Sequence, residues 1–212
     1  FRAQEAEDLL QEVFVKALPL VVDEARQGLK AAIAIATAVA LIAVGVSLVE
    51  VAGDSAVTVY RVGDWAAPFG IVLVVDRISA VFVLLAAVLG ASTLVFSLAR
   101  WHRAGPRFDT LVMFLLMGVD GAFLTGDLFN LFVFFEVLLA ASYGLALHAS
   151  GTLRVNAGLH YITVNLAASL LFLIGASLIY GATGTLNMAD LARHWREPAT
   201  GAAKRAVRIV PG

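Results

Sequence analysis

The sequence predicts an all-α polytopic membrane protein with about five complete transmembrane helices. Of its 212 residues, 60% are hydrophobic and only 15% are charged, and the mean hydropathy is +0.89. Uncharged runs long enough to cross the roughly 30 Å hydrocarbon core of a bilayer recur along the chain, with short polar connectors between them. Together these features exclude an ordinary soluble domain.

Charge and residue usage exclude several other classes of protein. The net charge of −1 gives no indication of nucleic-acid binding. The absence of cysteine excludes disulfides, thiolate metal sites and iron–sulfur ligation. The four histidines, moreover, form no ligand pair at helical spacing; they are His102, His148, His160 and His194. For both reasons we expect no metal and no cofactor.

The first 30 residues are predicted to form a polar or amphipathic N-terminal segment that includes an incomplete membrane span. Residues 1–12 carry five charged side chains, do not have the pattern of a signal peptide, and are expected to be amphipathic or disordered. Residues 13–22 are apolar but too short to cross a membrane, and a lysine and a proline interrupt them, so they form at most the end of a span. The first complete span is expected at residues 31–49.

A small external β-hairpin is expected between the first two complete spans, in the loop formed by residues 50–77. The stretch VTVYRV alternates in the manner of a strand, Gly63-Asp64 is a turn signal, and FGIVLVVD is too short to span. The next span is expected at residues 78–99. A polar connector follows it, in which Pro106 prevents the helix from continuing.

Residues 110–147 form a nearly unbroken apolar run that must fold back on itself. A single helix of this length would be about 57 Å long, roughly twice the thickness of the hydrocarbon core. The expected bend is the turn cluster of Gly126, Asp127 and Asn130, in which Asp127 would cap the second helix. This bend separates one span at 110–125 from another at 130–147.

A last span is expected at residues 159–181, which closes a membrane domain of residues 31–181. Residues 182–212 then form an external amphipathic segment and a basic tail. Basic residues in the short loops place the connectors at 23–30, 100–109 and 148–158 in the cytoplasm, whereas the five basic residues of the tail favour the opposite orientation.

Glu136 is the first candidate proton-transfer residue. It lies about two turns into the span at 130–147, among several phenylalanines. An ionisable side chain at that depth costs several kcal/mol unless it meets a partner or a water-filled path, so such groups are usually functional. The alternative is that Glu136 pairs with a neighbouring helix and has only a structural role.

Asp120 and His160 are further candidates for proton transfer. Asp120 lies within the span at 110–125, about two turns before the bend, and could instead reach the outer interface. His160, at the inner end of the last span, could deliver protons from the cytoplasm because histidine titrates near neutral pH, or could simply be solvated. No lysine falls inside any predicted span, although lysine is the obvious partner for an intramembrane glutamate.

The segment GAFLTGDLFNLFVFFEVLLAASYGL, residues 121–145, resembles the D subunit of the Mrp-type multisubunit cation/proton antiporters, also called Mnh or Pha. The stretches at 60–80, 158–175 and 181–192 agree, so the resemblance covers roughly residues 18–192. It implies a fragment of a longer helical bundle, related to the antiporter-like subunits of respiratory complex I, in which Glu136 belongs to the proton pathway. The family pairs that glutamate with a lysine on a later helix, which this sequence does not contain, so we interpret the sequence as an N-terminal portion of such a protein.

The resemblance implies a membrane subunit of a monovalent cation (Na+)/proton antiporter in the bacterial plasma membrane, a secondary transporter rather than an enzyme. The implied partners are the other membrane subunits of the antiporter complex, H+ and Na+, and the lipid bilayer. Two alternatives stay open. One is a proton-pumping subunit of a complex I-like NADH:quinone oxidoreductase or a membrane-bound hydrogenase, and the other is a truncated membrane scaffold that transports nothing.

Overall fold

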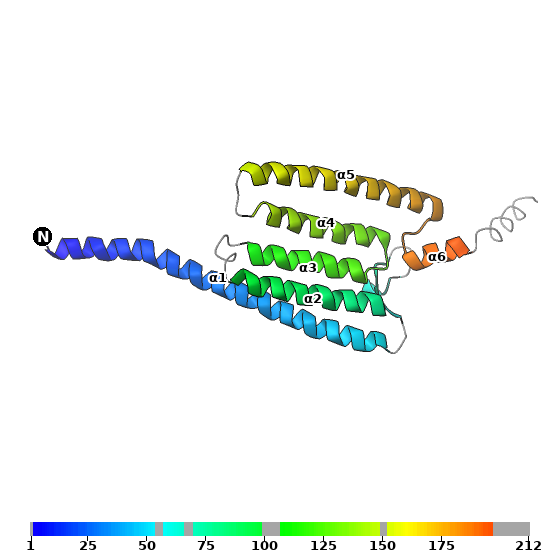
Figure 1. Cartoon of the computed structure of the whole chain (residues 1–212), viewed down its shortest axis with the longest axis horizontal. Coiled ribbons are helices and arrows are strands. Elements are labelled where there is room, and N and C mark those ends of the chain that lie inside the picture. Colours follow the sequence, from blue (N-terminus) through cyan, green and yellow to red (C-terminus); the bar gives the residue numbers. More distant parts are fainter. Residues whose placement is uncertain (1, 54–56, 66–69, 99–106, 149–151, 197–212) are drawn as a thin grey trace, which may run out of the picture.

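The structure is a computed structural model of the chain. It describes residues 2–53, 57–65, 70–98, 107–148 and 152–196. Five long helices lie side by side in chain order and run alternately in opposite directions, and a short sixth helix lies beyond the helix ends on one side of the bundle (Figure 1). Their bounds are α1 Arg2–Gly53, α2 Arg77–Leu98, α3 Phe108–Leu124, α4 Leu128–Ala146, α5 Thr152–Thr183 and α6 Met188–Arg196.

The predicted all-α membrane fold is confirmed. Four helical segments of the described chain are long and apolar enough to cross a membrane: Gly28–Gly53, Arg77–Ser97, Leu128–Ala146 and Arg154–Thr183. Helix α3, which matches the expected span at 110–125, has 17 residues and is therefore about 26 Å long. It packs between α2 and α4, so it forms part of the same layer.

Helix α1 is longer than the sequence suggested. The segment expected to be an amphipathic or disordered lead is continuous with the first span in one helix of 52 residues. Alanine, leucine, glutamate and glutamine dominate residues 2–12 and are strong helix formers, which accounts for the continuation. In Figure 1 this part of α1 extends past the ends of the other helices.

The small hairpin expected in the loop at residues 50–77 is also confirmed. Strands β1 (Thr58–Arg61) and β2 (Val72–Val75) pair antiparallel, with Thr58 opposite Val75 and Arg61 opposite Val72. Chain reversal begins in the short 3-10 helix η1 (Val62–Asp64). There Gly63 and Asp64 adopt positive φ values of 67° and 59°, a conformation that favours glycine and is tolerated by aspartate.

Small residues allow the helices to pack closely. A cluster of Ala34, Ala38, Leu94, Val112 and Leu116 joins α1, α2 and α3. At the contact between α3 and α4, a Cβ atom added to Gly118 would lie 2.8 Å from the backbone nitrogen of Leu138. The two helices can approach this closely only because residue 118 has no side chain, as is common between transmembrane helices.

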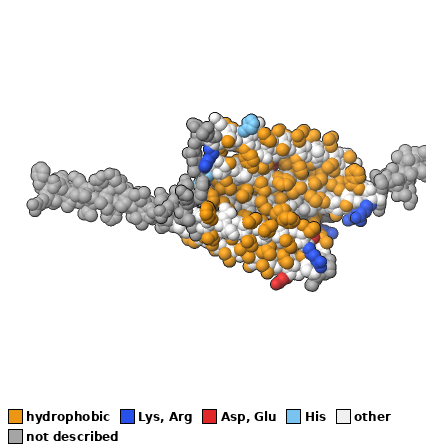
Figure 2. Space-filling model, viewed as in Figure 1, with side chains coloured by type: hydrophobic (Ala, Val, Ile, Leu, Met, Phe, Trp, Pro, Cys, Tyr) orange, Lys and Arg blue, Asp and Glu red, His pale blue; other side chains and the backbone are white. Residues whose placement is uncertain are grey.

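The outer faces of the helices are apolar. Large hydrophobic side chains are exposed along the lengths of α2 and α5, among them Leu85, Leu89, Leu170, Leu171 and Leu178. Figure 2 shows that hydrophobic side chains cover the face of the bundle in view, whereas lysine and arginine gather toward its two ends. An apolar surface of this extent requires contact with lipid or with other membrane helices.

Candidate functional site

The turn between α3 and α4 is a buried polar cluster. The Asp127 carboxylate accepts a hydrogen bond of 2.9 Å from the backbone N–H of Asn130 and so caps α4. The side-chain amide of Asn130 donates to Oγ1 of Thr125 at 2.9 Å. The Gly126 N–H donates to the carbonyl of Val72 at 2.8 Å, which ties the turn to strand β2. The chain therefore bends where Gly126, Asp127 and Asn130 were expected to bend it.

This turn also positions the start of α6. Asp127 and Asn187 form an isolated antiparallel bridge. The Leu128 N–H donates to the carbonyl of Leu186, and the Met188 N–H donates to that of Gly126. The sequence alone did not predict this contact, because it joins residues about 60 positions apart.

Glu136 lies on α4, just over two turns after the helix begins, and is half-buried. Its Oε1 atom is inaccessible to solvent and has no hydrogen-bond partner among the residues that the structure describes. Phe134 and Leu138 are the α4 residues that meet Gly121 and Gly118 of α3. Because Glu136 is two positions from each of them, it points away from α3, on the same side of the helix as Phe132.

The side chains around Glu136 connect α4 to α5. Phe132 stacks on Phe172 of α5 with ring centroids 6.1 Å apart, and Phe135 meets the same ring edge-on at 6.4 Å. The phenylalanines that the sequence placed near Glu136 thus form part of the contact with the next helix. These aromatic rings lie within four residues of Glu136 on α4, and none of them can form an ion pair or a conventional hydrogen bond with a carboxylate.

Asp120 lies on the opposite side of the α3–α4 pair. It is only 9% exposed, and its Oδ1 atom is buried without a hydrogen-bond partner in the described chain. Asp120 follows Val112 and Leu116 at intervals of four residues, and these two residues pack against α1 and α2. The structure therefore does not bring Asp120 and Glu136 together, because the two carboxylates face different neighbouring helices.

His160 is exposed on α5 and lies next to a pair of hydroxyl groups rather than next to Glu136. The hydroxyl of Tyr161 is 3.1 Å from Oγ of Ser142, and its ring meets that of Tyr143 edge-on at 5.5 Å. Tyr143 follows Glu136 by seven residues, which places it on the same side of α4 about 10 Å farther along. The sequence alone did not single out these hydroxyl groups, although it shows the seven-residue spacing between Glu136 and Tyr143.

Cations are absent from the vicinity of both buried carboxylates in the described part of the chain. The ion pair that the described chain does contain lies within α6, where Arg193 is 3.5 Å from Asp190. No group of three or more histidine, aspartate or glutamate side chains that could hold a metal ion occurs among the residues searched. The site thus consists of isolated carboxylates whose partners would have to come from water, a mobile cation or further protein.

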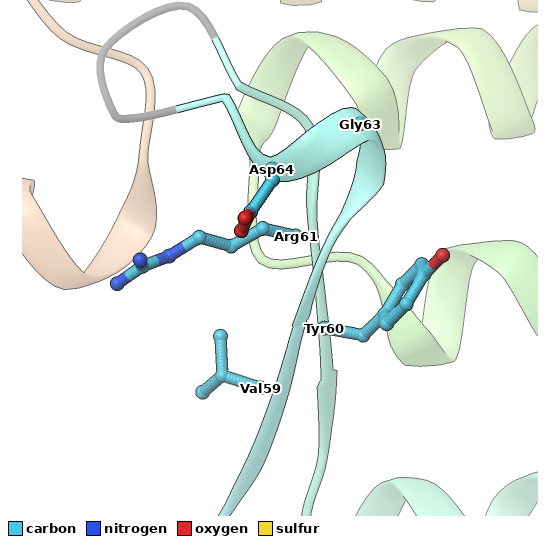
Figure 3. Close-up of a pocket in the computed structure, with 5 residues that line it drawn as sticks. All are labelled: Val59, Tyr60, Arg61, Gly63 and Asp64. Carbon is cyan, nitrogen blue, oxygen red and sulfur yellow. The ribbon is translucent and has the colours of Figure 1, made fainter.

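Two pockets lie at the hairpin end of the bundle, away from these carboxylates. The first is a shallow hollow of about 530 Å³ lined by β1 and η1; Figure 3 shows Arg61 and Asp64 on one side of the strand and Tyr60 on the other. The second, of about 840 Å³, lies between the hairpin, the start of α2 and α6, with Asp76, Asn187 and Arg193 among its lining residues. Neither is lined by Glu136 or Asp120.

Residues 125–206 match a family model described as "NADH:quinone oxidoreductase/Mrp antiporter, TM". The chain is 54% identical over 189 residues to the D subunit of a probable K(+)/H(+) antiporter of Rhizobium meliloti, a match that covers 87% of this chain and 35% of the relative. It is 48% identical over 141 residues to the D subunit of the Na(+)/H(+) antiporter of Alkalihalophilus pseudofirmus, covering 66% of this chain and 29% of that one. The resemblance to the D subunits of the Mrp-type antiporters is confirmed.

Solved structures agree with this assignment. The chain superposes on a chain of the Mrp complex from Dietzia sp. with a TM-score of 0.73 and 37% identity, over 82% of this chain and 35% of that one. A chain of an archaeal membrane-bound sulfane sulfur reductase matches with a TM-score of 0.74 and 29% identity, and the match covers 85% of this chain and 39% of that one. The chain is therefore a multi-pass membrane protein related to the Mrp-type D subunits, and it spans about a third of the length of the relatives that it matches.

Proposed function

We propose that this chain carries part of the proton pathway of a monovalent cation/proton antiporter, in which Glu136 takes up and releases the proton. The observation that supports this most directly is the Glu136 carboxylate itself. One of its oxygens is buried without a hydrogen-bond partner in the described chain, on a helix of a protein similar to the D subunits of antiporters. Because Glu136 points away from α3, it can respond to a group that arrives from outside this pair of helices.

The physical basis is the sensitivity of a desolvated carboxyl group to nearby charge. In a membrane span the ionised form is stable only when a cation or water is close, so the arrival or departure of such a partner moves the proton on or off. The described residues supply no fixed cation beside Glu136, so its protonation state is free to follow an approaching partner. An exchange cycle that couples proton movement to cation movement needs such a group.

The proposal extends to the transported ion and the setting. Relatives are named both as K(+)/H(+) and as Na(+)/H(+) antiporter subunits, so we propose Na+ or K+ as the exchanged cation. We also propose that other membrane subunits complete the transporter, and that it works in the bacterial plasma membrane. The apolar outer faces of α2 and α5 support such an assembly, because they must be covered by lipid or by other helices.

The test is a Glu136→Gln substitution, which keeps the size of the side chain and removes its proton exchange. The chain is expressed with the other subunits of its antiporter in a host that lacks its own antiporters. Proton movement is then measured in inverted membrane vesicles after addition of Na+ or K+. We expect at least a tenfold loss of exchange for Glu136→Gln. Glu50→Gln, at an exposed carboxylate near the end of α1, is the matched control and should retain activity.

Retention of full exchange by Glu136→Gln would contradict the proposed role of this residue. If the unmodified complex also exchanges no ions although it inserts and assembles, the scaffold alternative is favoured.

A proton-pumping subunit of a respiratory complex is the second candidate. The likeness to the sulfane sulfur reductase chain supports it, because the TM-score equals that of the Mrp complex within 0.01. The same vesicles distinguish the two candidates. A cation gradient drives proton movement without an electron donor if the chain serves an antiporter, whereas a respiratory subunit moves protons only when an electron donor and acceptor are supplied.

A further inference from the structure

An apolar groove runs along the boundary between α2 and α3. It reaches the end of the bundle at which α3 begins and α4 ends. Its volume is about 370 Å³, and its lining includes Ala86, Gly90 and Thr93 of α2, Phe108 and Val119 of α3, and His148 after α4. The volume falls within the range of small-molecule pockets. Helices α2 and α3 pack on each other less extensively than α3 and α4 do, which leaves room for the groove.

The shape of the groove suits a hydrocarbon chain. From Phe108 to Val119 it follows α3 for about 17 Å, and its floor includes Ala86 and Gly90, which present little or no side chain. Almost every residue that lines it is apolar; Thr93 donates its hydroxyl hydrogen to the carbonyl of Leu89 and so offers no free donor to a ligand. A long, narrow and apolar trough of this kind accommodates an extended chain better than a compact polar solute.

One end of the groove is polar. The Nε2 atom of His148 is buried and has no hydrogen-bond partner among the described residues. The imidazole ring lies 5.6 Å from the ring of Phe108, so it sits at the start of α3. A buried imidazole nitrogen without a partner is costly, because its interaction with water has been lost and not replaced. Because His148 also lines the groove, a rotation of its ring would present this nitrogen to a ligand atom there.

The charges at this end favour an anionic ligand. Arg154 donates to the carbonyl oxygen of His148 at 2.6 Å, and Arg107 directly precedes Phe108. Lys30 of α1 lies about one turn before Ala34, which packs in one cluster with Leu94 of α2 and Val112 of α3. Asp109 opposes these three cations, so the four side chains together carry a formal charge of +2, which is complementary to a phosphate group.

We propose that a phospholipid with an anionic headgroup occupies this groove. One acyl chain lies between α2 and α3, and the phosphate accepts hydrogen bonds from His148 and from the neighbouring guanidinium groups. The basic residues of the short loops favour the cytoplasmic side for this end, where anionic lipids gather in the leaflet and attract basic residues. The inference is independent of the proposed antiport, because it concerns binding and makes no use of Glu136.

The experiment measures lipid retention by the full chain. The protein is incorporated into nanodiscs of phosphatidylcholine with one fifth phosphatidylglycerol, extracted into detergent, and examined by native mass spectrometry. We expect one molecule of phosphatidylglycerol to stay bound, with at least a fivefold preference over phosphatidylcholine after correction for abundance. Absence of retained lipid, or retention of the two lipids in proportion to their abundance, would overturn the proposal.

Two adjacent hydroxyl residues provide a matched pair of variants. Ser92 and Thr93 are both exposed on α2, and each donates its hydroxyl hydrogen to the carbonyl four residues earlier, but only Thr93 lines the groove. Thr93→Phe should reduce the retained lipid at least fivefold, whereas Ser92→Phe should leave it unchanged. Equal retention by the two variants would contradict binding in the groove. If Thr93→Phe does not fold, Ala86→Leu fills the same groove from a position about two turns earlier in α2 and takes its place.

The headgroup contact has its own variants. His148→Phe keeps an aromatic ring against Phe108 but removes the nitrogen, and should abolish the preference for phosphatidylglycerol while some lipid stays bound. Arg154→Gln should weaken the same preference. Arg196→Gln, at an exposed position of α6, should have no effect. An unchanged preference in His148→Phe would show that the phosphate does not bind at this end of the groove.

Discussion

Asp127 and Asn187 pair with each other as an isolated antiparallel bridge, and each of them caps the helix that begins at the following residue. The Asp127 carboxylate accepts from the N–H of Asn130, and the Asn187 side-chain oxygen accepts from the N–H groups of Ala189 and Asp190. Helices α4 and α6 therefore start from one paired segment. A displacement of α6 would be transmitted to the start of the helix that carries Glu136.

Removal of the Asn187 cap should release α6. Asn187→Ala leaves two backbone N–H groups without an acceptor, and loss of a cap of this kind costs about 0.5–2 kcal/mol. We expect trypsin to cleave after Arg193 several times faster in this variant, measured by the decay of the intact chain on gels. Asn165→Ala is the control, because Asn165 bonds only to the carbonyl of Tyr161 within α5 and should leave the cleavage rate unchanged.

Asp76 should make the start of α2 sensitive to acid. Its carboxylate accepts from the backbone N–H of Ser79 at 2.7 Å, and this hydrogen bond holds the pKa of Asp76 below its ordinary value of 3.8. Because the pKa is lower in the folded state, the stabilisation is present above pH 3.8 and is lost as the pH falls toward the folded-state pKa. Thermal unfolding of Asp76→Asn in detergent should therefore show a smaller loss of stability below about pH 4 than the unmodified chain. An identical acid profile in the two proteins would contradict this role.

The close approach of α3 and α4 should not tolerate a side chain at residue 118. Gly118→Ala places a Cβ atom 2.8 Å from the Leu138 nitrogen, which forces the helices apart and should cost about 1–3 kcal/mol. Gly175→Ala meets nothing within 4 Å on α5 and should be neutral or stabilise the helix by up to about 1 kcal/mol. Thermal melts in one detergent compare the two variants, and equal melting temperatures would contradict the packing described here.

The buried carboxyl group of Asp120 should make the protein less stable than an apolar side chain at the same position would. A buried carboxyl oxygen without a partner costs about 1–3 kcal/mol, and leucine has a similar branched shape without the polar atoms. Asp120→Leu should therefore melt at a higher temperature than the unmodified chain. If Asp120 also transfers protons, the same variant should lose ion exchange in the vesicle assay, so that stability and activity change in opposite directions. A lower melting temperature would indicate that Asp120 has a polar partner.

The sequence by itself determined the class of the protein, the positions of its helices and the location of its bend. The hydropathy of residues 31–49, 78–99, 110–147 and 159–181 is a local property, and so are the turn preferences of Gly126 and Asp127, so neither depends on the rest of the fold. The hairpin in the loop at 50–77 followed from alternation and a turn signal, which are equally local. The charges of residues 1–12 exclude a membrane span and predict an amphipathic or disordered segment, but glutamate, glutamine and arginine also favour helices, so α1 is longer than expected.

Only the tertiary structure decided which groups meet. Asp120 and Glu136 both lie in apolar helices near one bend. Asp120 is on the side of α3 that packs against α1 and α2, whereas Glu136 is on the same side of α4 as Phe132, which contacts α5. The docking of α6 through Asn187, the hydroxyl pair of Ser142 and Tyr161, and the groove that ends at His148 were likewise not visible beforehand. A sequence specifies the angle of each side chain around its own helix axis, but the neighbour at that angle depends on how the helices pack, which is a property of the whole layer.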